Sequence, residues 1–281
     1  MTKAETLSCF AVNTYSYTMQ EDVRTTVRRL SRRGVREFEL QMYPGHLWPA
    51  QIDKHGRVEL KAMLEGDGVS VSTLNMPNID LNIAAATVEM RQMSMGVLRG
   101  VVQLAADIGA EGVVIGPGKA NPLMPMPRPW LIDHFYSALQ ELVPLAESVG
   151  TEIYVENMPF AFLPGADELL DALDKFGNPR IGVVYDVANG HFVKEDVGAA
   201  LRACAKRLKI VHVSDTNQTV YRHDAVGMGT LDFAPIPGIL REIGFARRPV
   251  LEIIAADADS DIEHSAQELV AMGWGNHPDV A

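Results

Sequence analysis

The sequence predicts a single (β/α)₈ barrel, the TIM-barrel architecture of the α/β class, and three observations support this fold. Short β-branched runs alternate with amphipathic stretches along the whole chain, and eight such pairs can be counted. The length of 281 residues is close to the roughly 250 residues typical of one such barrel. No linker or low-complexity tract divides the chain. We therefore expect one domain over residues 1–281.

The expected elements follow one another with regular punctuation. A helix is expected over residues 21–33, where Val27 and Leu30 alternate with arginines in a helical pattern. A glycine that can end a helix in the left-handed conformation stands just before four strands, at Gly34, Gly109, Gly150 and Gly244. The strands are expected at residues 7–12, 35–40, 69–74, 112–115, 152–156, 181–185, 209–213 and 250–254.

The composition is that of a globular, acidic protein. Apolar residues make up 47% of the chain and charged residues 22%, which argues against a long disordered region. The formal net charge of −11 would repel a phosphate backbone, so nucleic acid is not an expected partner. The one dense basic run, residues 24–36, has helical periodicity, and we interpret it as a solvated outer face.

The chain shows no targeting or redox motif. No apolar run approaches the roughly 18 residues of a membrane span, and the start MTKAETLSCF lacks the apolar stretch of a signal peptide. Cys9 and Cys204 are the only cysteines, and neither belongs to a CxxC pair. We therefore expect a cytoplasmic protein without a membrane partner.

Four strands in the second half of the chain each end on a side chain that can bind a metal ion. These are Glu156 in IYVENMP, Asp186 in IGVVYDVAN, His212 in IVHVSD and Glu252 in PVLEII. Their spacings of 30, 26 and 40 residues each match one strand, one helix and their loops. Barrel strands point their C-terminal ends into one shared pocket, so we expect the four to converge. Such a set suits one divalent ion, with Mn²⁺ expected and Mg²⁺, Co²⁺ or Zn²⁺ as alternatives.

The motifs VENMP, VVYDVANGHF, VHVSDTN, RHDAVGMGTLDF and VLEI resemble those of the xylose-isomerase-like TIM barrel superfamily, which contains sugar isomerases and epimerases. The resemblance covers the whole chain as an eightfold β/α pattern, and the distinctive motifs lie in the second half. By similarity to ketose 3-epimerases, Glu156, Asp186, His212 and Glu252 match a Glu-Asp-His-Glu set around one divalent ion. The resemblance also implies that two of these glutamates act as acid and base.

The leading hypothesis is a metal-dependent isomerase or epimerase of a small polyhydroxy carbonyl compound, such as a sugar, sugar phosphate or keto-polyol. A cation bound to the carbonyl and the adjacent hydroxyl would stabilise the enediolate that forms when the neighbouring proton is removed. Glu156 and Glu252 are the candidate catalytic residues, one abstracting and the other returning a proton. Return on the opposite face gives epimerisation, whereas return to the neighbouring carbon gives aldose–ketose isomerisation.

A dehydratase is the alternative hypothesis, because the chain also resembles the inosose and 3-dehydroshikimate dehydratases of the same superfamily. The same intermediate would then expel a hydroxyl as water, with His223 or another nearby acid protonating it. An apurinic endonuclease is disfavoured, since the chain is acidic and the third and fourth strands do not end on histidines. Retention of both glutamates argues against a non-catalytic sugar-binding barrel.

A second group of residues is predicted to bind substrate, namely His223, Asp224, Arg222, Asn189, Asp215 and Asn13. His223 lies in RHDAVGMG, which resembles the RHxxxG segment with which superfamily members bind substrate or a further metal. Loop capping by Asp215 and a salt bridge between Arg222 and Asp224 are the structural alternatives. Asn189 and Gln218 replace a histidine and an arginine that contact substrate in ketose 3-epimerases. This departure argues against a plain ketohexose 3-epimerase.

Other positions near the expected pocket have weaker signals. Strand ends place Tyr15, Glu39, Gln41 and Asn75 toward the pocket, and we interpret each as structural. His46 and Trp48 follow the second strand, where an aromatic ring could stack on a sugar or close the pocket. The loop over residues 116–129 is expected at the active-site end, as a lid or as a subunit contact. We expect a homodimer or homotetramer.

Overall fold

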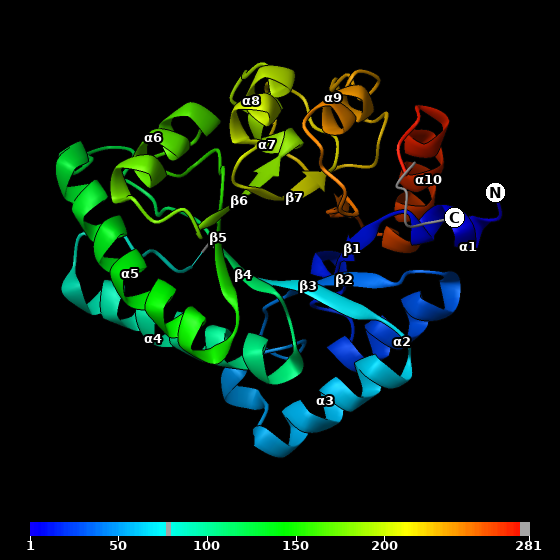
Figure 1. The fold of residues 1–281 in the computed structure, drawn as a ribbon, viewed down its shortest axis with the longest axis horizontal. Coiled ribbons are helices and arrows are strands. Elements are labelled where there is room, and N and C mark those ends of the chain that lie inside the picture. The colour runs from blue at the N-terminus through cyan, green and yellow to red at the C-terminus, as the bar shows by residue number, and fades with distance from the viewer. Residues whose placement is uncertain (77–79, 276–281) are drawn as a thin grey trace.

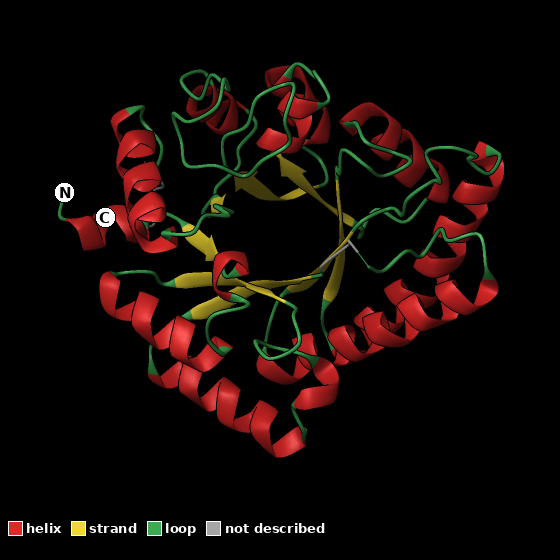
Figure 2. Cartoon of the chain, turned by 180° about the vertical axis from the view of Figure 1, so that it is seen from behind, coloured by secondary structure: helices red, strands yellow, loops and turns green. Residues whose placement is uncertain are grey.

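The computed structural model describes residues 1–76 and 80–275, which form a closed barrel of parallel strands surrounded by helices (Figure 1). The strands pair in chain order, and the last closes the barrel against the first. Figure 2 shows the strands around the centre, with the helices outside them. The predicted (β/α)₈ architecture is confirmed. The strands are β1 (Ala11–Asn13), β2 (Glu37–Gln41), β3 (Ser70–Asn75), β4 (Gly112–Ile115), β5 (Glu152–Glu156), β6 (Gly182–Asp186), β7 (Leu208–Val213) and β8 (Val250–Leu251).

The helices cover the outside of the barrel. The two longest, α4 and α5, pack against each other along one side (Figure 1). The α-helices are α1 (Lys3–Ser8), α2 (Val23–Arg33), α3 (Lys54–Gly66), α4 (Val88–Ile108), α5 (Arg128–Val149), α6 (Ala166–Phe176), α7 (Val187–Phe192), α8 (Val197–Cys204), α9 (Ile236–Glu242) and α10 (Ala258–Ala271). Two short 3₁₀ turns, η1 (Tyr15–Tyr17) and η2 (Pro49–Gln51), follow β1 and β2.

Glycines end helices where the sequence predicts that they do. Gly109 and Gly150 follow α4 and α5 with φ angles of 81° and 83°, and each donates its backbone N–H to the last helical turn. A residue with a Cβ atom is disfavoured in this conformation. At the other end of a helix, Asp22 caps α2 by accepting a hydrogen bond from the backbone N–H of Thr25. These local signals determine the residues at which the helices begin and end.

The first strand is displaced from its predicted position. Leu7 and Ser8, which the sequence analysis placed in a strand over residues 7–12, belong to α1 instead. Thr2 and Glu5 form a capping box, in which each side chain accepts a hydrogen bond from the other residue's backbone N–H, and this starts a helix. Strand pairing begins only at Ala11.

The last strand is shorter than predicted. Pairing was expected over residues 250–254 but covers only Val250 and Leu251. Beyond the strand, Ile254 donates its N–H to the carbonyl of His223 in the loop after β7, with an N to O distance of 2.8 Å. The chain thus leaves the ladder for a loop contact, and Glu252 directly follows the end of β8.

The basic run on α2 has a structural role. Arg29 and Arg33 both form ion pairs with Asp259 of α10, and Arg33 also pairs with Glu263.

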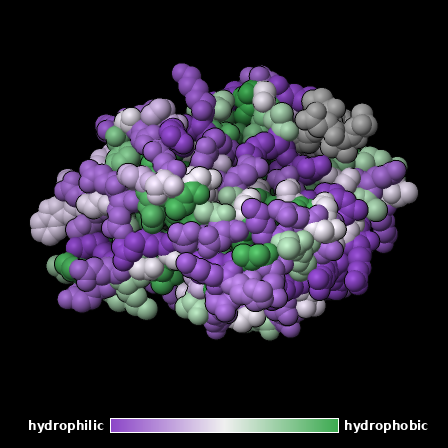
Figure 3. Space-filling model, turned by 60° about the horizontal axis from the view of Figure 1, so that its bottom comes forward, coloured by the Kyte–Doolittle hydropathy of each residue, from purple (hydrophilic) through white to green (hydrophobic). Residues whose placement is uncertain are grey.

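Polar residues cover most of the face shown in Figure 3, where apolar residues occur in small separate patches. None of the described helices combines the length and apolarity that crossing a membrane requires.

Candidate metal centre

Four buried side chains converge at the C-terminal ends of β5 to β8. Glu156 and Asp186 end β5 and β6, His212 lies one residue before the end of β7, and Glu252 directly follows β8. One potential ligand atom from each residue lies within 4.8 Å of the others. The structure therefore brings together the four residues that the strand spacing predicts to meet.

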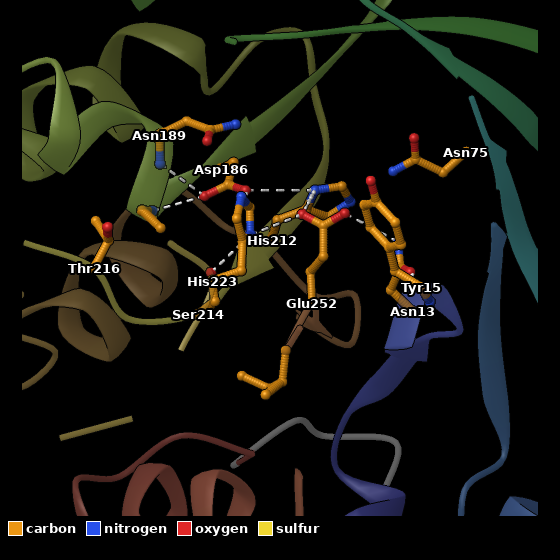
Figure 4. A network of polar contacts seen from close by, with 12 residues as sticks. Asn13, Tyr15, Asn75, Asp186, Asn189, His212, Ser214, Thr216, His223 and Glu252 are labelled. Atoms are coloured by element: carbon orange, nitrogen blue, oxygen red, sulfur yellow. Dashed lines mark hydrogen bonds and ion pairs between the residues drawn. The ribbon is translucent and has the colours of Figure 1, made fainter. Parts of the chain in front are cut away.

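His212 lies near Asp186 and Glu252, as Figure 4 shows, and also near Glu156. Its Nδ1 atom is 3.3 Å from Glu156 Oε1, 3.2 Å from Glu252 Oε2 and 3.9 Å from Asp186 Oδ2. Within the described part of the chain, Asp186 Oδ2 and both ring nitrogens of His212 are buried without a hydrogen-bond partner, and of these Asp186 Oδ2 and His212 Nδ1 face the cluster. Buried polar atoms normally have a partner. A divalent ion among these atoms would satisfy both, and the mixed oxygen and nitrogen donor set fits such an ion.

Glu39 lies on the far side of the His212 ring from this cluster. Its Oε1 atom is 2.9 Å from His212 Nε2, and both side chains are completely buried. Three neutral side chains donate hydrogen bonds to the same carboxylate, from Asn13 (2.6 Å), Thr73 (2.6 Å) and Asn75 (3.0 Å). The contact directs Nε2 of His212 toward Glu39 and leaves Nδ1 facing the cluster, as carboxylates behind metal-binding histidines do.

From its sequence position alone, Glu39 is expected to be only a structural residue at a strand end. The signal that could have distinguished it is its sequence context, FELQ, in which an acidic residue interrupts a strand next to buried positions. A charge in that place needs a buried partner to offset its desolvation. Its partner, His212, lies five strands further along the chain, so local sequence could not identify it.

Without a bound cation, the buried carboxylates of the cluster repel one another. Burial raises the pKa of both Glu156 and Glu252 to about 7, with the nearby histidines opposing the shift. Burial would by itself lower the pKa of His212, but Glu39, Glu252 and Glu156 outweigh it and hold that pKa well above its usual range. The imidazole is thus the local source of positive charge. A bound divalent cation would take over that role and displace protons from the site.

Asp186 has two separate tasks, one for each carboxylate oxygen. Its Oδ1 atom caps α7 by accepting hydrogen bonds from the backbone N–H groups of Ala188 (2.7 Å) and Asn189 (3.0 Å). Its Oδ2 atom faces the cluster. The side-chain carbonyl of Asn157 also accepts the backbone N–H of Asp186, at 2.7 Å. The carboxylate is therefore held in place before any ligand binds.

The cluster opens into a cavity of about 320 Å³. Its polar lining includes Glu156, Asn189, His223 and Glu252, together with Asn75 and Lys119. Much of the remaining lining is apolar and comes from β4, α4 and the loops after β3, β4 and β5, with Met76, Leu81, Ile83, Leu98, Ile115 and Phe160 among its residues. Gln41 also lines the cavity, and its buried Oε1 has no hydrogen-bond partner among the described residues. Concave sites of this size and mixed lining are typical of small-molecule binding.

A family model described as a xylose isomerase-like TIM barrel matches residues 27–272. The chain belongs to this family. Among curated proteins, an L-ribulose 3-epimerase from Mesorhizobium japonicum is 26% identical over 72% of this chain and 66% of its own length. An uncharacterized protein from Methanocaldococcus jannaschii is 26% identical over 61% of this chain and 60% of its own length. The chain thus spans about two thirds or less of these curated relatives.

Solved structures share the fold over nearly the whole chain. A D-tagatose 3-epimerase-like protein has a TM-score of 0.81 and 20% identity, covering 94% of this chain and 96% of its own. A structure described as IOLI protein with a binding zinc atom has a TM-score of 0.78 and 17% identity, covering 93% of this chain and 96% of its own. These likenesses agree with the xylose isomerase-like barrel seen here.

Of the predicted substrate-binding residues, His223 and Asn189 line the cavity of this xylose isomerase-like barrel. His223 Nδ1 is 3.3 Å from Glu252 Oε2 and 3.0 Å from Ser214 Oγ. Asn189 Nδ2 donates hydrogen bonds to Glu156 Oε1 (3.2 Å) and to the backbone carbonyl of Asn157 (2.8 Å). Each of the two therefore contacts one of the candidate catalytic glutamates.

Asn13 acts on the cluster from behind. Its Nδ2 atom donates to Glu39 Oε1 and, at 3.2 Å, to Glu252 Oε1, while its Oδ1 accepts from the backbone N–H of Tyr15. It does not appear among the described residues that line the cavity, although Tyr15 does. The geometry thus assigns Asn13 to orienting Glu252 and Glu39.

Asp215, Arg222 and Asp224 lie outside the described cavity lining. The buried Asp215 carboxylate accepts hydrogen bonds from four backbone N–H groups, those of Thr216, Gly227, Gly229 and Leu231. It therefore organises the loop after β7, which is the loop-capping alternative. Arg222 is largely exposed, with its Nη1 3.9 Å from Asp224 Oδ1, which is the salt-bridge alternative.

The loop after β2 could, from its sequence, stack an aromatic ring on a sugar or close the pocket, but its His46 and Trp48 lie elsewhere. His46 is buried, with Nδ1 2.7 Å from the carbonyl oxygen of Glu21 and Nε2 3.0 Å from Thr14 Oγ1. Neither His46 nor Trp48 is among the described lining residues of the cavity. His46 thus ties two loops together. The loop predicted over residues 116–129 ends earlier, because α5 begins at Arg128. In this loop Gly116, Gly118 and Lys119 line the cavity, whereas Met124 is exposed.

Proposed function

We propose that the protein is a divalent-metal-dependent isomerase or epimerase of a small polyhydroxy carbonyl compound, such as a sugar, sugar phosphate or keto-polyol. The observation that supports this most directly is the buried cluster of Glu156, Asp186, His212 and Glu252, whose potential ligand atoms lie within 4.8 Å of one another. The cluster opens on a cavity suited to a small molecule. The likeness to an L-ribulose 3-epimerase adds support for carbohydrate chemistry.

These four residues would hold one divalent ion, and we propose Mn²⁺, with Mg²⁺, Co²⁺ and Zn²⁺ as alternatives. The zinc atom in the IOLI structure agrees with a divalent ion in this fold. When bound, the ion would supply positive charge where negative charge develops on the substrate's carbonyl oxygen. Asp186, capped onto α7, and His212, backed by Glu39, are the two rigid members of the set.

Glu156 and Glu252 would exchange the proton with the carbon next to the carbonyl. They lie at the ends of strands that are separated by β6 and β7, and both line the cavity. Both side chains are carboxylates at the cavity, and a carboxylate can accept a proton and return it. Asn189 and Asn13 donate hydrogen bonds that orient Glu156 and Glu252 respectively.

A dehydratase reaction remains the second candidate, and the position of His223 favours it. His223 lines the cavity with its Nδ1 3.3 Å from Glu252 Oε2. An imidazole beside the proton-abstracting carboxylate could protonate a departing hydroxyl. Both reactions begin with the same proton abstraction, and the product distinguishes them.

The test is proton NMR in D₂O with a panel of ketoses, sugar phosphates, keto-inositols and 3-dehydroshikimate. Metal-depleted protein is compared before and after addition of Mn²⁺. We expect Mn²⁺-dependent loss of the proton signal next to the carbonyl, and its abolition in Glu156→Gln and Glu252→Gln. The product then identifies an isomer, an epimer or a dehydrated compound.

Glu152→Gln is the matched control, because Glu152 lies at the opposite end of β5 and pairs with Lys209. This variant should keep the exchange activity. If titration calorimetry detects no divalent ion binding to the wild-type protein, and Glu252→Gln changes nothing, the proposed centre is wrong.

A further inference from the structure

Tyr221, which is not among the residues predicted from the sequence, connects two polar side chains of the cavity wall, Asn189 and His223. Its hydroxyl oxygen is 2.7 Å from Asn189 Oδ1 and 2.7 Å from His223 Nε2. Asn189 contacts Glu156, and His223 contacts Glu252. Tyr221 is thus the middle member of a polar bridge between the two glutamates at the cavity.

The donor and acceptor in each hydrogen bond of this bridge follow from the backbone carbonyl of Asn157, which can accept a hydrogen bond but cannot donate one. Asn189 has a backbone carbonyl, that of Asn157, 2.8 Å from one end of its amide group. A carbonyl oxygen only accepts, so the amide nitrogen Nδ2 must face Asn157, and Oδ1 must face Tyr221. Since Oδ1 is itself only an acceptor, the hydroxyl of Tyr221 donates its proton to Asn189.

The same count of donors and acceptors determines which ring nitrogen of His223 bears a hydrogen. A tyrosine hydroxyl has one proton, and that proton is used on Asn189. The contact between the Tyr221 oxygen and His223 Nε2 can then be a hydrogen bond only if Nε2 bears the hydrogen. This holds whether the ring is neutral or charged. In the neutral ring Nδ1 is unprotonated, and it faces Ser214 Oγ and Glu252.

We propose that Tyr221 is a positioning residue that reserves Nε2–H of His223 and Oδ1 of Asn189, so that His223 acts on the cluster and substrate through Nδ1. Nδ1 faces the cluster, since it lies 3.3 Å from Glu252 Oε2 and 3.7 Å from Asp186 Oδ2. The amide nitrogen of Asn189 is likewise kept facing Glu156. Without the hydroxyl, the His223 ring would lose the acceptor that selects its tautomer, and the Asn189 amide would keep only its contacts with Asn157 and Glu156.

The ring of Tyr221 is held by packing that does not involve its hydroxyl. Its centroid is 5.3 Å from those of Phe160 and Phe192, and 5.2 Å from that of His223. Burial also raises the pKa of Tyr221, so the hydroxyl keeps its proton at neutral pH. Tyr221→Phe therefore removes the hydrogen bonds and retains the aromatic packing.

The decisive experiment measures the histidine tautomer by ¹⁵N NMR of the full-length, ¹⁵N-histidine-labelled protein, with His223→Gln used to assign the His223 signals. In the wild type we expect a protonated Nε2. In Tyr221→Phe we expect a measurable population with Nδ1 protonated, because Nδ1–H can donate to Glu252 while Nε2–H has lost its acceptor. An unprotonated Nε2 in the wild type, or an unchanged tautomer in Tyr221→Phe, overturns the proposal.

Tyr136→Phe is the matched control for losing a tyrosine hydroxyl. Tyr136 donates at 2.8 Å to the carbonyl of Ala172 on the outer helices, and so its loss should leave the His223 signals unchanged. If Tyr136→Phe shifts the tautomer as much as Tyr221→Phe does, the effect is general destabilisation and the proposal fails.

The effect on turnover rests on the proposed function and is measured separately. Where the wild type exchanges deuterium, Tyr221→Phe should slow the exchange about 10- to 100-fold, as losses behind a reacting group commonly do. An unchanged exchange rate together with a shifted tautomer would contradict the functional part of the proposal. If the wild type exchanges nothing, the proposed function fails, whereas the tautomer measurement still decides the role of Tyr221.

Discussion

Glu39 Oε1 lies 2.9 Å from His212 Nε2, and the two side chains, from β2 and β7, are both fully buried. This pair determines which imidazole nitrogen faces the cluster of carboxylates. The three neutral donors around Glu39 keep its carboxylate satisfied without competing charge. Burial by itself would raise the pKa of Glu39, but His212 together with the hydrogen bonds from Thr73 and Asn75 outweighs it and lowers that pKa.

We predict that Glu39→Gln lowers the affinity for Mn²⁺ by about 10- to 100-fold, the usual cost of removing a partner behind a metal-binding histidine. The amide can still contact Nε2 but no longer compensates the ring's charge. Titration calorimetry provides the measurement. Glu37→Gln is the control, because Glu37 starts the same strand and pairs with Arg248 at 3.2 Å. Equal affinities of Glu39→Gln and the wild type would contradict the role assigned to Glu39.

The stabilisation provided by a divalent cation should grow as pH rises from about 5.5 to about 7.5. The pKa of Glu156 and Glu252 is raised from 4.5 to about 7 in the metal-free fold. Such groups contribute stability that is present below pH 4.5 and is lost as pH rises through about 7. The raised pKa of His212 acts in the same direction above pH 6.5.

Thermal unfolding with and without Mn²⁺ at several pH values measures this increment. At a cation concentration of 100 times Kd, the expected stabilisation is about 2.7 kcal/mol. An increment that decreases toward higher pH would contradict protonation of the site in the metal-free protein. The difference with and without cation isolates this cluster from carboxylates elsewhere.

Asp186→Asn should weaken metal binding while changing the stability of the fold only slightly. An asparagine can still cap α7, so the variant should unfold within about 1 kcal/mol of the metal-free wild type. It loses the charged atom Oδ2 that faces His212, and Mn²⁺ affinity should therefore fall at least about tenfold. Denaturant unfolding and calorimetry are the two measurements. A large loss of stability without a loss of affinity would reverse the roles assigned to the two oxygens.

Asp215→Ala should destabilise the fold by about 3 kcal/mol, because backbone N–H groups that the carboxylate satisfies are left without a partner. Urea unfolding of the metal-free protein checks this. Asp232→Ala is a milder comparison, since that exposed carboxylate accepts one hydrogen bond among the described residues, from the N–H of Ala234 at 3.1 Å. If Asp215→Ala is as stable as the wild type but binds substrate poorly, Asp215 contacts the substrate instead.

Much of the fold and the four-residue cluster could be predicted because both depend on short-range signals repeated at a regular spacing. Alternating strands and helices imply parallel pairing, and parallel pairing in a barrel places strand ends together. Glu156 and Asp186 are therefore predictable from strand ends alone. The error at Leu7 arose because an apolar run before β1 was interpreted without the capping box at Thr2.

The partners of the cluster could not be predicted in the same way. Glu39 and Tyr221 act through contacts with His212 and His223 that depend on side-chain direction and on loop conformation. Asp215 looked like a polar group available to a ligand, yet the loop after β7 folds back so that its backbone uses the carboxylate. Such roles follow from hydrogen-bond accounting, which requires coordinates.

The two-residue strand β8 has a consequence for how the barrel holds together. Glu252 follows this strand, and its carboxylate meets Asn13 at the end of β1, across the seam where the first and last strands pair. A cation bound to Glu252 would at the same time be bound to β5, β6 and β7. It would act as a clasp across the two-residue pairing of β7 with β8, and amide hydrogen exchange in β8 would slow when the cation is bound.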